Sequence, residues 1–68
     1  MNVKYFKDTD TALLEFSDAD VDETREIAAN VYVDLDKSGN LVSMTIEHAA
    51  ATARLPYVRI EEIDASAA

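Results

Sequence analysis

Residues 31–46 read VYVDLDKSGNLVSMTI, and this stretch decides the fold. Apolar and polar side chains alternate on both sides of residues 37–40, which is the period of a β-strand with one buried face. Gly39 is the only glycine of the chain and suits a hairpin position that requires a positive φ. The stretch therefore predicts two antiparallel strands joined by a tight turn.

The alternation also extends to the N-terminal side of this hairpin. From residue 24 to residue 36, one side of an extended chain carries Ile27, Ala29, Val31, Val33 and Leu35. Asn30 is the expected place for a bend inside this run, because asparagine tolerates left-handed backbone angles. We therefore predict one strand over residues 24–36 and a second over residues 41–47. The inward side chains of the second are Val42, Met44 and Ile46.

Another hairpin is expected at the N-terminus. Residues 1–6 and 11–16 alternate in the same way, and residues 7–10 read KDTD, a sequence whose side chains bond to nearby amides in turns. The inward side of the second strand carries Ala12, Leu14 and Phe16. Leu13 faces the other way, because successive side chains of a strand point to opposite faces.

The period changes after residue 47. Residues 48–55 are rich in alanine and predict a short helix, which Pro56 ends because proline pushes the residue before it out of the helical region. The apolar side chains of residues 57–63 fit the alternation of a strand, although two of them also have helical spacing. We favour a strand for this segment.

These elements define the fold class as α+β. We predict a four-stranded antiparallel meander sheet with one short C-terminal helix and an extra C-terminal strand. Residues 1–64 are expected to form a single domain and residues 65–68 a disordered tail. The pattern leaves open which face of the sheet the helix covers.

The size of the chain favours self-association. A chain of 68 residues is near the lower limit for a self-sufficient core, and such chains usually rely on disulfides, metals or oligomerisation. This chain has no cysteine and one histidine, which argues against disulfides and against thiolate or zinc sites. We therefore expect a homodimer and no cofactor.

The charge and the N-terminus restrict partners and location. The net charge of −8 repels phosphate backbones, so we expect no direct nucleic-acid partner, whereas a basic protein would be attracted. The N-terminus lacks the apolar core of a signal peptide, and no run is long enough to cross a bilayer. We expect a cytoplasmic protein with no membrane partner.

Several segments together resemble the DUF2283 domain, a family of small prokaryotic proteins of unknown function. They are Tyr5, DTDTALLEFSD at residues 8–18, EI at 26–27, VYVDLD at 31–36, GNLV at 39–42 and IEHA at 46–49. The resemblance covers about residues 3–55. Ser43 stands where many members have glycine, and HAA at residues 48–50 replaces the more usual Asp-Ala-Ser.

This resemblance implies a small antiparallel sheet with a helix, in agreement with the direct reading. It brings no known catalytic residues. Some members of the family look as though they are encoded beside small toxin-like proteins. The resemblance therefore implies an alternative function, an antitoxin-like role in which the protein neutralises a small basic toxin.

The turn of the central hairpin begins like a calcium loop. Asp34, Asp36 and Ser38 stand at positions one, three and five, and Gly39 stands at position six. Position twelve is Thr45, where a calcium loop requires a bidentate glutamate, and the flanks are strands where an EF-hand has helices. We interpret the segment as a hairpin turn ringed with solubilising acids, and predict no metal site.

Residues 17–23 carry four carboxylates and are predicted to form a loop that crosses to the next strand. On an extended chain Asp18, Asp20 and Asp22 lie on one side, where they could collect a cation or a basic partner. A solvated acidic loop is the interpretation we favour.

His48 is the only imidazole of the chain, and catalysis would require an orienting carboxylate and a nucleophile beside it. Glu47 points to the opposite face of a strand, and none of the serines stands in a nucleophile motif. We expect His48 to bond a backbone group or to cap the helix. The chain is therefore predicted not to be an enzyme, with a minimal hydrolase or cation-binding protein as the remaining alternative.

Apolar residues outside the expected core predict interfaces. Leu13 and Tyr32 lie on the side opposite the core, among polar neighbours, and form an apolar patch if their strands are close. Tyr57, Val58 and Ile60 lie in the C-terminal segment. We predict a protein–protein interaction module that associates as a homodimer through its sheet surface or this segment.

Overall fold

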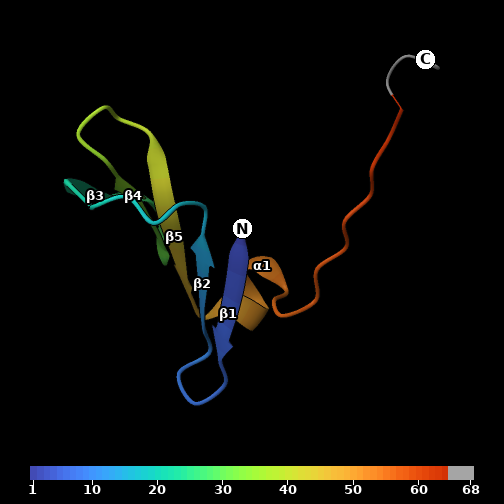
Figure 1. Ribbon diagram of the computed structural model, residues 1–68. Helices are drawn as coiled ribbons and strands as arrows, with labels where there is room; N and C mark the ends of the chain where they lie inside the picture. Colours follow the sequence, from blue (N-terminus) through green and yellow to red (C-terminus); the bar gives the residue numbers. More distant parts are fainter. Residues whose placement is uncertain (65–68) are drawn as a thin grey trace.

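The computed structural model describes residues 1–64, which form one antiparallel sheet of five strands and one short helix (Figure 1). The elements are β1 (Asn2–Phe6), β2 (Thr11–Glu15), β3 (Glu23–Ala28), β4 (Val31–Leu35), β5 (Leu41–Glu47) and α1 (Ala49–Ala53). The strand order across the sheet is β1-β2-β5-β4-β3. The predicted α+β class is confirmed, but the predicted number of strands is wrong.

The fifth strand arises at Asn30. We predicted a single strand over residues 24–36 with a bend, but the φ of Asn30 is 66° and the chain reverses there, so that Ala28 lies opposite Val31. Two short strands form in place of one long strand. A register shift between Glu26 and Ala28 leaves Ile27 57% exposed, so its predicted place on the core side is wrong.

The strand order also differs from a simple meander. β3, β4 and β5 follow one another as neighbours, but β2 pairs with β5 and not with the strand that follows it in the sequence. The loop between β2 and β3 passes the ends of β5 and β4 on its way. The amide of Phe16 donates to the carbonyl oxygen of Val42 (2.8 Å) and that of Asp22 to the carbonyl oxygen of Leu35 (2.8 Å). The N-terminal hairpin of β1 and β2 thus joins the β3–β4–β5 unit through the pairing of β2 with β5.

One face of the sheet, which we call the apolar face, carries the core. Its members are Val3, Tyr5, Ala12, Leu14, Val31, Val33, Met44 and Ile46. Helix α1 packs on one end of this face, where Ala49 and Leu55 meet Ala12 and Ile46, and all four are buried. Val33 and Val42 are buried as predicted. The structure thus settles which face the helix covers.

The opposite face, which we call the polar face, has two rows of side chains that cross all five strands. One row is Asn2, Glu15, Ser43, Asp34 and Thr24, and the other is Lys4, Leu13, Thr45, Tyr32 and Glu26. The hydroxyls of Thr24 (2.6 Å) and Ser43 (2.5 Å) donate to the two carboxylate oxygens of Asp34, and Lys4 Nζ lies 3.0 Å from Glu15 Oε1. Cross-strand pairs of this kind fix the register of the sheet.

The C-terminal segment does not form the predicted strand. Residues 56–64, which we call the arm, run away from the sheet beside β1 and pair with no strand (Figure 1). A strand requires a neighbour for its backbone groups, and no strand of the described residues pairs with residues 56–63. The Cα radius of gyration is 13.9 Å, compared with about 11 Å for a compact chain of this length. The predicted disordered tail, residues 65–68, lies outside the described residues.

Among residues 1–64, no helix combines the length and the apolar character that a membrane span requires.

Candidate functional site

Half of the apolar face is left without a cover. Ala49 of the five-residue helix α1 and Leu55 just after it form one buried cluster with Ala12 and Ile46, against which Leu14 and Met44 pack. In the next row Val3 is 40% exposed, while Leu14 and Met44 are half-buried. No large side chain of the described chain is completely buried. Within residues 1–64, the apolar face therefore keeps Val3 exposed and Leu14 and Met44 partly accessible, next to the buried Val33 and Val42.

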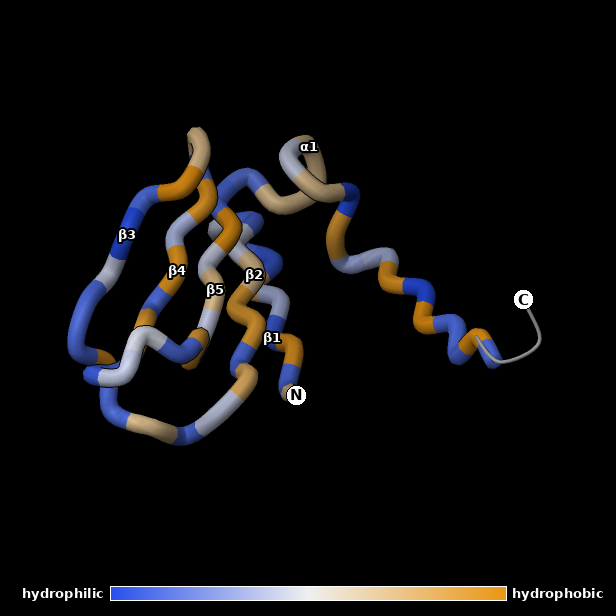
Figure 2. Tube along the Cα trace, turned by 90° about the horizontal axis from the view of Figure 1, so that it is seen from above, coloured by the Kyte–Doolittle hydropathy of each residue, from blue (hydrophilic) through white to orange (hydrophobic). Residues whose placement is uncertain are grey.

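The arm is the second exposed apolar feature. Tyr57, Val58, Ile60 and Ile63 are 86%, 54%, 83% and 78% exposed. Hydrophobic and hydrophilic residues alternate along the extended chain, as Figure 2 shows in orange and blue. Arg59 Nε lies 2.7 Å from Glu61 Oε1, as expected for residues two apart on one side of an extended chain. The side that carries Val58 and Ile60 continues with Glu62, and the other side carries Tyr57 and Ile63 besides the ion pair.

The root of the arm is fixed to the body. Leu55 is buried, and its amide donates to the carbonyl oxygen of Ala49 (3.1 Å). The amide of Tyr57 donates to the carbonyl oxygen of Arg54 (3.1 Å). Arg54 has a φ of 57°, so the chain turns sharply where the helix ends. Residues 58–63 belong to no strand and are exposed. The predicted interface residues Tyr57, Val58 and Ile60 thus lie together, far from the polar face.

Leu13 and Tyr32, the other predicted interface residues, lie on the polar face. Both lie opposite Thr45, one on each side, and both are half-buried. The carboxylate of Glu26, and then that of Glu47, raises the pKa of the Tyr32 hydroxyl by favouring its neutral form. The structure therefore places these two residues in one row, as a small patch between charged side chains.

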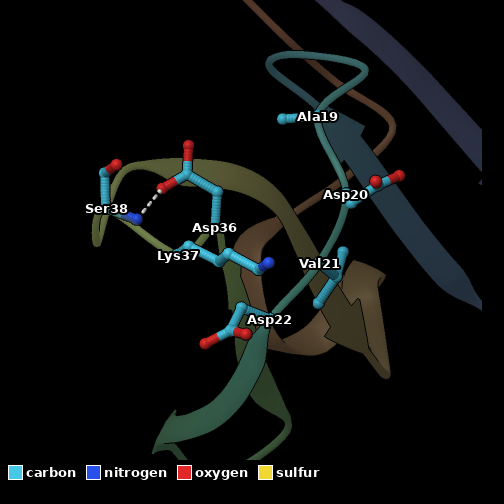
Figure 3. Close-up of a pocket in the computed structure, with 7 residues that line it drawn as sticks. All are labelled: Ala19, Asp20, Val21, Asp22, Asp36, Lys37 and Ser38. Atoms are coloured by element: carbon cyan, nitrogen blue, oxygen red, sulfur yellow. Dashed lines mark hydrogen bonds between the residues drawn. The ribbon is translucent and has the colours of Figure 1, made fainter.

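A shallow hollow of about 290 Å³ lies between the β2–β3 loop and the β4–β5 turn (Figure 3). Its lining consists of Ala19, Asp20, Val21, Asp22, Asp36, Lys37 and Ser38. Three aspartates and one lysine thus line the hollow at one end of the sheet, and the three carboxylates point in different directions (Figure 3). The sequence indicated each acidic segment but not that the loop and the turn lie side by side.

The residues of the calcium-like motif have separate tasks. Asp34 accepts the two hydroxyl hydrogen bonds on the polar face, whereas Asp36 Oδ1 accepts the amides of Ser38 and Asn40, each at 2.9 Å, within the turn. Gly39 has a φ of 82°, the conformation predicted for it. Within residues 1–64, no three His, Cys, Asp or Glu side chains gather closely enough to hold a metal ion.

His48 occupies the N-cap position of α1, but its side chain makes no capping hydrogen bond. Its φ of 51° is left-handed, and its carbonyl oxygen accepts the amide of Thr52 (2.8 Å). The prediction that the imidazole caps the helix is therefore wrong. The backbone of this residue, not its ring, makes the corner between β5 and the helix.

The cap comes from Asp10, which the sequence analysis did not identify. The amide of Ala50 donates to Asp10 Oδ1 (3.1 Å), and the amide of Ala49 donates to the Asp10 carbonyl oxygen (2.8 Å). The Tyr5 hydroxyl also donates to Asp10 Oδ1 (2.7 Å). The hydrogen bond to Asp10, aided by burial and by the carboxylate charge, raises the pKa of Tyr5. The only sequence signal was a turn rich in Asp and Thr.

One comparison with known proteins identifies a family. The family model described as protein of unknown function (DUF2283) matches residues 2–49. This span runs from β1 to the first residue of α1, so it contains the whole sheet and excludes the arm. Comparison with curated proteins and with solved structures gives no match. Because the family match covers more than half of the sequence, the chain belongs to the DUF2283 family, proteins of unknown function, as its sequence pattern predicted.

Proposed function

We propose that this protein is a non-enzymatic protein–protein interaction module that acts as a homodimer, bound through the uncovered half of its apolar face. The supporting observation is the exposed apolar surface over β1, β2 and β5, continuous with the buried core beneath α1. Contiguous apolar surface of this kind on a small protein marks an interaction site. An isologous interface, in which both copies contribute the same surface, closes under a twofold axis.

The exposed area supports the same proposal. The accessible surface is 5372 Å². A compact monomer of this mass exposes roughly 4,250 Å², so each copy exposes an excess of about 1,100 Å². Stable dimers bury about 800 Å² per partner, and the excess is sufficient for that.

Sedimentation equilibrium tests the homodimer. We expect a mass twice the 7.5 kDa of one chain at micromolar concentration. Because each copy carries a net charge of −8, added salt should screen the repulsion and strengthen the dimer. A monomer at about 100 µM at every salt concentration would contradict the proposal, because dissociation constants of such interfaces fall well below that concentration.

A second candidate function is the binding of a basic protein, as in an antitoxin that neutralises a basic toxin. The observation that favours it is the hollow of Figure 3, where Asp20, Asp22 and Asp36 come together from two segments. Like charges that converge on one end of a molecule attract a partner of opposite charge and speed its encounter.

The two candidates differ in their response to salt. A basic protein that co-purifies with this chain should dissociate as salt is added, and the variant Asp20→Asn/Asp22→Asn should bind it more weakly, because attraction between surface charges is screened. The matched control is Asp8→Asn/Asp64→Asn, which removes two charges outside the hollow. If both variants bind a basic partner equally, the acidic end is not its docking site.

A further inference from the structure

We propose that the homodimer is formed by exchange of arms: in each copy the arm crosses to the second copy and lays Val58 and Ile60 on Val3, Leu14 and Met44 of its apolar face. This inference rests on the proposed function and names the occupant of the uncovered face. Arm and face are both exposed in a single copy, and each offers apolar surface. A second copy of the chain supplies one of each.

The arm has the shape that such a site requires. Its seven residues from 57 to 63, when extended, reach about 20 Å, whereas the distance from β1 to β5 is about 10 Å. Val58 and Ile60 share one side of the arm about 7 Å apart, so the two side chains together span most of this distance. The Arg59–Glu61 ion pair lies on the other side of the arm and remains in water.

The side from which the arm leaves also fits. It runs off on the β1 side of the sheet in both views (Figures 1 and 2), opposite to β3. The β3 edge carries Glu23, Arg25 and Glu26, and charges of this kind protect a sheet edge from association. On β1, Val3 is exposed on the apolar face, whereas the exposed Phe6 shares the polar face with Lys4.

The arm does not return to its own sheet. The turn at Arg54 and the buried Leu55 direct the chain away from the face, and the residues after Tyr57 are all exposed. To cover its own Val3 the arm would have to reverse directly after this fixed root. Exchange requires no such reversal, and two reciprocal arms cover the excess surface of both copies at once.

Cysteine cross-linking tests the contact directly, since the chain has no cysteine of its own. Ile60→Cys and Val3→Cys are prepared separately, one of them isotopically labelled, and then mixed under mild oxidation. We expect a disulfide between one labelled and one unlabelled chain, seen by mass spectrometry. The matched control mixes Ile60→Cys with Ile27→Cys, a position that is more exposed than Val3 (57% against 40%) but lies on β3. It should give little of that product.

A second experiment measures the dissociation constant. Val58→Ser/Ile60→Ser should raise it at least about 100-fold, because two apolar side chains are lost from each of two arms. The control Val21→Ser/Ile27→Ser removes two aliphatic side chains of similar exposure, 51% and 57%, near β3 and should leave the constant within a few-fold. Far-ultraviolet circular dichroism verifies that all variants keep the sheet.

The outcomes separate this inference from the proposed function. A wild-type dimer with the Ile60–Val3 cross-link and a weakened arm variant supports both. A dimer that forms no such cross-link and is unaffected by Val58→Ser/Ile60→Ser overturns arm exchange and leaves the homodimer standing. A wild-type monomer overturns the homodimer itself. An intramolecular disulfide in Val3→Cys/Ile60→Cys would show that the arm folds onto its own sheet, and would also overturn the exchange.

Discussion

At the scale of single residues, Asp10 connects strand β1 with helix α1. It accepts hydrogen bonds from Tyr5 in β1 and from Ala50 at the start of α1, forty positions away. Its φ of 54° belongs to the left-handed region, which aspartate and asparagine tolerate better than most residues. The carboxylate therefore holds the helix on the apolar face as well as completing the first turn.

Removal of this carboxylate should destabilise the fold. We expect Asp10→Gly to lower the free energy of unfolding by about 1 kcal/mol, because the Ala50 amide loses its acceptor. Asp10→Asn tolerates the same φ and keeps an acceptor, so it should lose much less. Urea denaturation measures both. Equal stability of the two variants would show that the cap contributes nothing.

The Tyr5–Asp10 contact also predicts a pH dependence. The pKa of Tyr5 is raised in the folded protein, above its ordinary value of 10.0, so the folded state holds the phenolic proton more tightly than the unfolded chain does. The stabilisation is complete below about pH 10 and is lost as pH rises through the raised pKa. Between about pH 9 and pH 11 the wild type should therefore lose more stability than Tyr5→Phe. Parallel losses in urea titrations would argue against the contact.

At the scale of the elements, Asn30 decides between four strands and five. Its left-handed φ makes the turn between β3 and β4, and its carbonyl oxygen accepts the amide of Glu47 (2.8 Å). The sequence marked Asn30 as irregular, but a bend and a reversal both use the same left-handed residue. The pairing of β3 with β4 distinguishes the two, and it depends on residues on both sides of the turn.

Substitution at Asn30 should show what the turn requires. Asn30→Val places a β-branched residue at a positive φ and should cost about 1–2 kcal/mol of unfolding free energy. Asn30→Gly accepts that φ and should be nearly neutral. Thermal or urea unfolding checks the order of the three proteins. A valine variant as stable as the wild type would indicate that residues 24–36 can form the single bent strand.

At the scale of the whole molecule, the sheet is too thinly covered to stand alone. A helix of five residues covers one end of the apolar face, and the arm carries four large apolar side chains in water. The burial that the core lacks within one copy is available between two copies. Association and folding are then linked, because the dimer is stabilised only in its folded form.

This linkage predicts that stability depends on concentration. A tenfold rise in protein concentration should stabilise the folded dimer by about 1.4 kcal/mol and raise its Tm by several degrees. Melting curves at about 10 µM and 100 µM, followed by circular dichroism, measure the shift. Val58→Ser/Ile60→Ser should melt lower and with a smaller dependence on concentration. Superimposable wild-type curves would indicate a monomer.

Sequence alone determined what depends on neighbouring residues. Alternation in residues 31–46 fixed two strands with Val33 and Val42 inward, and Gly39 fixed the turn between them, because sterics and side-chain period act within a few positions. The pairing of β2 with β5, the cap from Asp10 and the separation of the arm from the sheet were decided only by the tertiary structure. Each depends on which distant surfaces bury one another, and no local period carries that information.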